Sequence, residues 1–338
     1  MTDRPLGDRR RLAGQLIRGI DVPTARALYP RLQDYFGVWA MQPEPLLAAA
    51  NNLKALDLAA HIRSYRDDGD GATAGPADYE LRGGVAIIDV QGTLMKAVSS
   101  FEASTSTVLL RQQIRHAFRN TDAAGILLRF DSPGGTVAGT EDLAADIAAA
   151  AGGKPVYGYA EDLCASAAYW GYSQCTKTFA NATALVGSIG TYMAIEDLSG
   201  HAEQLGVKVH VIRAGTFKGA GTPGTEITDD QLAEWQRIVD ELNAHFIAGV
   251  ARGRRMGESK VRELADGRVH VGQAAVQLGL VDVIESFDDT LARLSRDAKG
   301  KGATRLGAPG SSTSSRRLSI VQAIVKGQSN SVKNIHRK

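Results

Sequence analysis

Two residues, Ser166 and Lys218, pair a nucleophile with a base. Ser166 lies in the run Asp162-Leu-Cys-Ala-Ser-Ala-Ala-Tyr169 and Lys218 in the run Ala214-Gly-Thr-Phe-Lys-Gly-Ala-Gly221. A serine hydroxyl is a weak nucleophile and needs a neighbouring group that accepts its proton. A lysine does this only when neutral, a form that burial among apolar and small residues favours. Because small residues flank both side chains, the pair predicts acyl transfer by a buried Ser/Lys dyad.

A glycine pair upstream of the serine, Gly134-Gly135, is a candidate oxyanion hole. It follows the apolar run Ile126–Phe130 and precedes an alanine-rich stretch, which predicts a strand, a turn and a helix. Glycines allow unusual backbone angles, and N–H groups exposed at such a turn can stabilise a tetrahedral oxyanion. A plain connection between a strand and a helix is the alternative.

A further serine, Ser188, stands in the run Gly187-Ser-Ile-Gly190 after a short apolar stretch. Its hydroxyl could orient the lysine amine inside the site. Equally, it could be a turn serine that bonds its own backbone, which is the commoner role of Gly-Ser segments.

Other nucleophiles and bases are less well placed in the sequence. Seven histidines leave a Ser-His-Asp triad formally open, but none has a comparable setting. Cys164 precedes Ser166 by two residues, and we expect it to be a packing residue. With Cys175 it forms neither a metal-ligand nor a disulfide spacing, which fits a reducing compartment. The sequence predicts no metal and no cofactor.

The elements that must position these residues alternate along the chain and predict an α/β domain. We expect strands at 85–90, 125–130, 155–160 and 207–213, and helices at 104–118, 140–150, 165–172 and 228–252. The last helix has an apolar face formed by Leu232, Trp235, Ile238, Val239, Leu242 and Phe246.

Composition divides the chain into three parts: a helical N-terminal extension and linker (1–78), a catalytic domain (79–296) and a flexible tail (297–338). The net charge is +2, but ten basic residues and one acidic residue lie from Arg296 onward, so the remainder carries −7 (2 − 9). The tail could contact head proteins or nucleic acid, or only solubilise the chain. No stretch approaches a membrane span or a secretory signal, which predicts a cytoplasmic protein.

Several motifs together resemble the signal peptide peptidase A family, including its phage branch of head-maturation proteases. The resemblance covers roughly residues 80–290 and depends on the order and spacing of these segments: Asp131-Ser-Pro-Gly-Gly135, Ala165-Ser-Ala-Ala-Tyr169, Gly187-Ser-Ile-Gly190, Thr216-Phe-Lys-Gly-Ala-Gly221, Asp266-Gly-Arg-Val269 and Gly279-Leu-Val-Asp282. The roles it implies are nucleophile for Ser166, general base for Lys218, lysine-holding hydroxyl for Ser188, and oxyanion-hole amides for Gly135 and Ala167, with Gly134 competing for the first. Members of this family often have glycine beside the nucleophile where this chain has alanine, which should narrow the pocket.

The resemblance also implies a fold and a function. The fold would be the spiral of ββα units shared by the Clp protease and crotonase superfamily. The function would be a serine endopeptidase that cleaves scaffold or other head proteins during phage capsid assembly, as a homo-oligomer in the host cytoplasm or the assembling prohead.

Three alternatives stay open at this point. The chain could be a signal-peptide-degrading peptidase of a bacterial host, or a non-catalytic capsid-associated scaffold. It could also be a crotonase-like acyl-CoA enzyme, whose catalytic carboxylate would have to be Glu141, Asp142 or Glu161.

Overall fold

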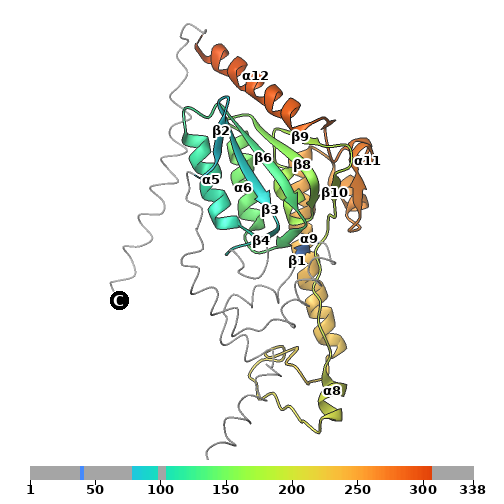
Figure 1. Cartoon of the computed structure of the whole chain (residues 1–338). Coiled ribbons are helices and arrows are strands. Elements are labelled where there is room, and N and C mark those ends of the chain that lie inside the picture. The colour runs from blue at the N-terminus through green and yellow to red at the C-terminus, as the bar shows by residue number, and fades with distance from the viewer. Residues whose placement is uncertain (1–38, 42–77, 98–103, 307–338) are drawn as a thin grey trace, which may run out of the picture. The chain divides into compact units, whose positions relative to one another are not determined.

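The computed structural model describes residues 39–41, 78–97 and 104–306 (Figure 1). Within the predicted helical N-terminal extension, residues 39–41 form a strand, so the helix prediction is wrong there. The rest of the extension before residue 78 and the part of the tail after residue 306 lie outside these ranges. The chain divides into two units, 1–298 and 299–338, each of which is described by itself. Helix α12 (Phe287–Leu306) continues past the predicted domain boundary at residue 297.

Parallel strands form the centre of the larger sheet, whose order is β11-β10-β8-β6-β3-β2. Neighbouring strands from β3 to β10 are parallel, whereas β2 and β11 pair antiparallel at the edges. β9 pairs with β8 and also with β12. The bounds are β2 Glu80–Arg82, β3 Val85–Gln91, β6 Gly125–Ser132, β8 Val156–Ala165, β9 Lys177–Ala180, β10 Leu185–Gly187, β11 Val269–Val271 and β12 Val283–Ile284. The near-continuous apolar runs of β3 and β6 suit strands buried on both faces, and the predicted α/β class is confirmed.

One pattern recurs along the chain: a strand of this sheet is followed by a short strand of a second sheet and then by a helix. β3 leads through β4 (Thr93–Met95) and β5 (Ser104–Ser106) to α5 (Thr107–Arg119), and β6 leads through β7 (Gly134–Thr136) to α6 (Thr140–Ala151). β8 leads directly to α7 (Ala167–Tyr172). The short strands form a four-stranded sheet in the order β1-β7-β4-β5, where β1 is Trp39–Met41. The predicted ββα units are therefore present in the segments that begin with β3 and β6.

Two apolar clusters pack against opposite faces of the larger sheet. Successive side chains of β3 point to opposite faces of the sheet. Ala86 and Ile88 belong to the main core, together with side chains of α5, α6 and α7. Val85 and Ile87 instead face the cluster that contains Leu294 of α12. We refer to the two sheets and the helices packed on them as the body.

Residues 192–242, which we call the arm, differ from the body. They comprise α8 (Ser199–Gln204), the loops around it and the first half of α9 (Asp229–Arg254), which begins with a capping box between Thr228 and Gln231. Figure 1 shows α8 beside the end of α9 that is distant from the sheets. The predicted strand at 207–213 is wrong, because this segment has no regular structure and no neighbouring strand to pair with. Helices α10 (Glu258–Leu264) and α11 (Gly272–Gln277) follow α9.

Candidate active site

Ser166 lies at the junction between β8 and α7, in a backbone conformation that only a few non-glycine residues adopt. Its φ is +54° and its ψ is −118°, and it directly precedes the first helical residue, Ala167. The residue is 1% exposed. Such strain persists only where the surrounding structure enforces it, and it occurs preferentially at functional sites.

Strand pairing places Ser188 next to Ser166. The parallel strands β8 and β10 pair Ala165 with Gly187, so each serine is the next residue after a paired position. The Ser166 N–H donates to the Gly187 carbonyl at 2.8 Å. Ser188 is also buried and also left-handed, with a φ of +51°. Two adjacent strands therefore end in strained serines at the same edge of the sheet.

The Ser166 hydroxyl is loosely held by its surroundings, whereas the backbone at Ser188 is firmly supported. The Ser166 hydroxyl donates to the Gly190 carbonyl over 3.4 Å, which is long for an O–H···O bond. The Ser188 N–H donates to the Arg268 carbonyl at 2.7 Å. The Asp266–Val269 segment of the predicted motif therefore supports the backbone at Ser188.

The glycine pair forms part of a strand rather than the predicted turn. Gly134 and Gly135 belong to β7, and the turn into α6 comes later, at Gly139 with a φ of +91°. A Cβ on Gly135 would lie 1.9 Å from the Leu94 carbonyl oxygen, so only glycine fits there. The Gly134 N–H already donates to the Ser132 hydroxyl at 3.2 Å. Gly134 and Gly135 are the two candidate oxyanion donors. Of these, it is the Gly135 N–H that does not donate to the Ser132 hydroxyl.

The helix that begins at Ala167 is fixed by its neighbours. All six residues of α7 are buried. The Trp170 ring stacks on Phe246 of α9 at 4.8 Å between centroids, and the Tyr169 hydroxyl donates to the Leu280 carbonyl at 3.1 Å. The first N–H groups of a helix have no partner within the helix, so the Ala167 amide suits a substrate oxygen.

Lys218 is not brought to this site within the single chain. It lies in a series of turns on the arm, where its N–H donates to the Gly215 carbonyl at 3.1 Å. Its side chain is exposed, and the neighbouring Phe217 is 48% exposed. The expectation that small and apolar neighbours bury this lysine is therefore wrong for one chain alone. Among the described residues no hydrogen bond joins Lys218 to either serine.

Comparison with known proteins relates part of this chain to a peptidase family. Residues 148–301 match the model of Peptidase family S49, and this range includes Ser166, Ser188 and Lys218. This range, slightly less than half of the chain, is therefore similar to the S49 peptidases. The glycine pair of β7 precedes the matched range. The resemblance predicted from the motifs is confirmed by this match and by a phage relative.

Two curated relatives and one solved structure illustrate the match. Capsid assembly protease C of Escherichia phage lambda is 28% identical over 285 residues, which cover 83% of this chain and 63% of that protein. Protease 4 of Salmonella typhi is 30% identical over 232 residues, covering 66% of this chain and 37% of that protein. A solved enoyl-CoA hydratase/isomerase family member aligns with 65% of this chain and 74% of its own chain, at 14% identity and a TM-score of 0.41. The chain spans less than two thirds of the length of either curated relative.

The side chains considered as alternative nucleophiles or bases are buried or interact with residues other than Ser166. Cys164 is fully buried, and burial raises the pKa of its thiol, as expected of a packing residue. The three acidic candidates of the crotonase reading form surface ion pairs: Glu141 with His245, Asp142 with Arg111, and Glu161 with Arg129. None of the described histidines forms a hydrogen bond with Ser166.

A partly buried ion pair that the sequence did not reveal anchors the end of α9 to the segment before β12. Arg254 donates to Asp282 at 2.6 Å, to the Thr178 hydroxyl at 2.8 Å and to the Gly279 carbonyl at 3.0 Å. Burial raises the pKa of Asp282, but hydrogen bonds from Arg254 and Thr178 outweigh it, so the net shift is downward. The Gly279–Asp282 motif was visible in the sequence, whereas nothing marked Arg254 as its partner.

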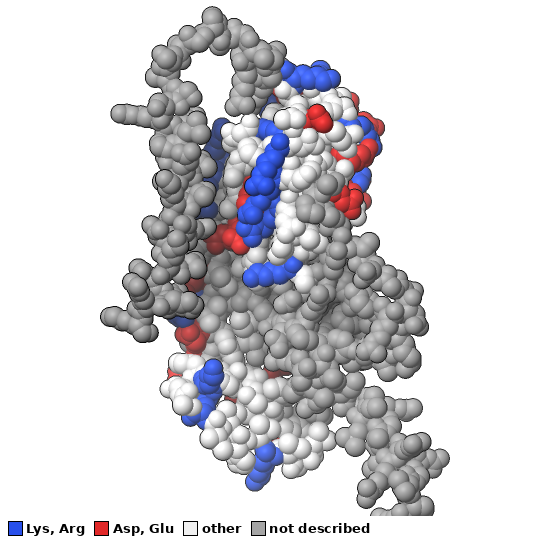
Figure 2. Space-filling view, turned by 90° about the vertical axis from the view of Figure 1, so that its left-hand side faces the viewer, with Lys and Arg blue, Asp and Glu red and all other residues white. Residues whose placement is uncertain are grey.

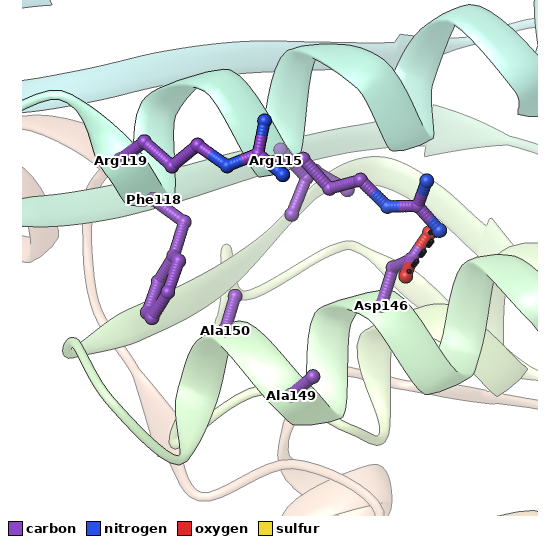
Figure 3. Close-up of a pocket in the computed structure, with 7 residues that line it drawn as sticks. Arg115, Phe118, Arg119, Asp146, Ala149 and Ala150 are labelled. Carbon is purple, nitrogen blue, oxygen red and sulfur yellow. Dashed lines mark hydrogen bonds and ion pairs between the residues drawn. The ribbon is translucent and has the colours of Figure 1, made fainter. Parts of the chain in front are cut away.

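A groove of about 260 Å³ lies between α5 and α6, and none of the predicted site residues lines it. Arg115 crosses it from α5 to Asp146 on α6, with Phe118 and Ala150 at its apolar end (Figure 3). Figure 2 shows Lys and Arg side chains on the side of the molecule that is on the left in Figure 1. Across the described ranges we find no metal-ligating cluster and no helix long and apolar enough to cross a membrane.

Proposed function

We propose that this protein is a serine endopeptidase whose nucleophile is Ser166 and whose general base is Lys218. The observation that carries the proposal is the pair of strained, buried serines at the ends of β8 and β10. Ser188 orients the lysine amine, and the amides of Gly135 and Ala167 form the oxyanion hole. The S49 match supports a peptidase, and the three carboxylates considered for a crotonase-like reaction lie on the surface beside His245, Arg111 and Arg129.

The chemistry is acyl transfer in two steps. The Lys218 amine accepts the Ser166 proton as the hydroxyl oxygen attacks the peptide carbonyl, and the oxyanion accepts hydrogen bonds from the two amides. The C–N bond then breaks, and the lysine returns the proton to the leaving amine. Water hydrolyses the acyl-enzyme with the same lysine as base, which regenerates both residues.

The lysine reaches the serine through assembly. The arm exposes large apolar side chains that a single chain leaves uncovered, among them Leu205 (66%), Ile212 (100%) and Phe217 (48%). Contiguous exposed apolar groups mark protein–protein contacts. In the homo-oligomer, the arm of one copy packs against the body of the next, so that Lys218 becomes buried beside the neighbour's Ser166.

The substrate class follows from the phage relative. That relative is named as a capsid assembly protease, and its match covers 83% of this chain. We propose that this chain likewise cleaves scaffold or other head proteins, in the host cytoplasm or the assembling prohead. A protein peptidase of this kind needs no cofactor, and the basic tail contacts head proteins or nucleic acid.

A labelling experiment tests the nucleophile. A fluorophosphonate probe should label the wild type at Ser166, and the protein should cleave fluorescent casein; Ser166→Ala should abolish both. The matched control is Ser295→Ala, which removes an exposed hydroxyl bonded to the Gly83 carbonyl and should leave both readouts unchanged. A folded wild type that neither reacts with the probe nor cleaves casein at any assembly state would favour a non-catalytic scaffold.

A further inference from the structure

The strand that carries the oxyanion glycines has a neighbour on each side. On one edge of β7, Leu94 of β4 pairs with Gly135 in parallel. On the other edge β1 pairs antiparallel, with Trp39 opposite Thr136, Ala40 opposite Gly135 and Met41 opposite Gly134. β1 is the terminal strand of this sheet.

This arrangement limits where a substrate can bind. Along a strand, successive N–H groups point to opposite edges, and each edge can serve only one partner at a time. Because β4 occupies one edge of β7, any β7 amide that is available to a substrate carbonyl points to the other edge. That is the edge where residues 39–41 lie. A peptide held there in extended form would add a strand to the sheet, a common mode of peptide recognition.

We infer that Trp39–Met41 occupies the position of the extended peptide substrate, and that a substrate enters by displacing this segment. The inference rests on the proposed function, since it takes the amides of β7 as oxyanion donors. A three-residue terminal strand has few ladder bonds and is easily exchanged. Its central residue, Ala40, stands opposite Gly135.

The test weakens β1 in the full-length protein. Ala40→Pro removes the N–H at the middle of the strand, and proline is poorly tolerated in a paired strand. The matched control is Leu81→Pro on β2, an antiparallel edge strand of the other sheet that pairs with Ala86. We expect Ala40→Pro to raise the rate of fluorophosphonate labelling of Ser166 about five-fold through the loss of ladder hydrogen bonds, and Leu81→Pro to leave it unchanged. An unchanged or lower rate in folded Ala40→Pro protein would show that β1 is a permanent structural strand and would overturn the inference.

Amide hydrogen exchange separates this inference from the proposed function. Exchange at Gly134–Thr136 should be faster in Ala40→Pro, and a synthetic peptide copying residues 36–45 should restore both the protection and the slow labelling. These exchange effects are expected even if Ser166 reacts with no probe, in which case the proposed function fails and the strand exchange stands. Protection that neither falls in the variant nor returns with the peptide would overturn the exchange of β1, whatever the chemistry at Ser166.

Discussion

The body and the arm differ in the exposure of their large apolar side chains. In the body, Trp170, Tyr169 and Phe130 are almost completely buried. In residues 192–242, all of which the structure describes, Ala202 and Gln231 are the only buried residues. The body thus buries most of its large apolar side chains within one chain, whereas the arm leaves Leu205, Ile212 and Phe217 exposed.

The same contrast separates the two proposed catalytic residues. Ser166 is held by strand pairing and by a buried helix, so its unusual backbone exists before any partner binds. Lys218 lies in a series of turns, and its side chain is exposed. On the function proposed above, folding alone would position the nucleophile and assembly would position the base, and the following experiments test this division.

Replacing each catalytic residue should have equal effects on activity and unequal effects on structure. Ser166→Ala and Lys218→Ala should each lower casein cleavage by about 10³-fold or more. Lys218→Ala should change the free energy of unfolding of the isolated chain by less than about 0.5 kcal/mol, because its side chain is exposed. Activity assays beside urea denaturation check both. Near-normal cleavage by Lys218→Ala would mean that Lys218 is not the general base.

Two positions on α9 should differ sharply in their contribution to stability. Phe246→Ala removes the ring that stacks on Trp170 and should lower the free energy of unfolding by about 3–5 kcal/mol. Leu232→Ala lies on the same helix, but its side chain is 49% exposed, so the expected change is below about 0.5 kcal/mol. Equal losses at the two positions would mean that the arm is packed as tightly as the body.

The Arg254–Asp282 pair should make the body sensitive to acid. The pKa of Asp282 is lowered in the folded state, so its contribution to stability is present above its unfolded pKa, near 4, and is lost as pH falls through the lower folded value. Because the Asp282 side chain is 38% exposed and partly screened by solvent, Asp282→Asn should be less stable than wild type at pH 7 by only about 0.5–1.5 kcal/mol, and the gap should narrow below pH 4. Urea midpoints measured from pH 7 to pH 2.5 check this. A gap that stays constant with pH would assign the loss to packing alone.

Polar substitution on the arm should leave the single chain unaffected and weaken assembly. Ile212→Ser changes a fully exposed side chain, so the free energy of unfolding should shift by less than about 0.5 kcal/mol. Sedimentation should show a smaller assembly than wild type at equal concentration. Leu81→Ser, at a 45% exposed position on the body, is the matched control and should sediment as wild type. If both variants sediment as wild type, this part of the arm is not an interface.

Local patterns in the sequence were sufficient for the body and for the serine half of the site. The apolar runs at 85–90 and 125–130 became β3 and β6, and the small residues around Ser166 and Ser188 became two strained strand ends. These features depend on neighbours that are close in sequence or paired by regular strands. The glycine pair was assigned to the wrong element, since its place in β7 depends on pairing with β4 and β1.

The arm could not be predicted in the same way. Alternating valines at 207, 209 and 211 are typical of a strand, and the apolar face of α9 is typical of a helix against a core. Both patterns indicate burial, but of the α9 face only Phe246 is buried in the chain. An apolar pattern in the sequence indicates that a surface is buried, but it does not indicate whether the same chain or another molecule buries it. The Arg254–Asp282 pair was missed for a related reason, since it joins residues 28 positions apart across three elements.

Mixing two inactive variants tests the central claim most directly. Ser166→Ala and Lys218→Ala proteins, each inactive alone, would be unfolded, combined in equal amounts, refolded and assayed for casein cleavage. If Lys218 of one copy serves Ser166 of the next, random assembly into a closed ring pairs an intact serine with an intact lysine at about one interface in four, so about a quarter of wild-type activity should return. A mixture that assembles but stays inactive would contradict the account, because it would mean that both residues must come from the same chain.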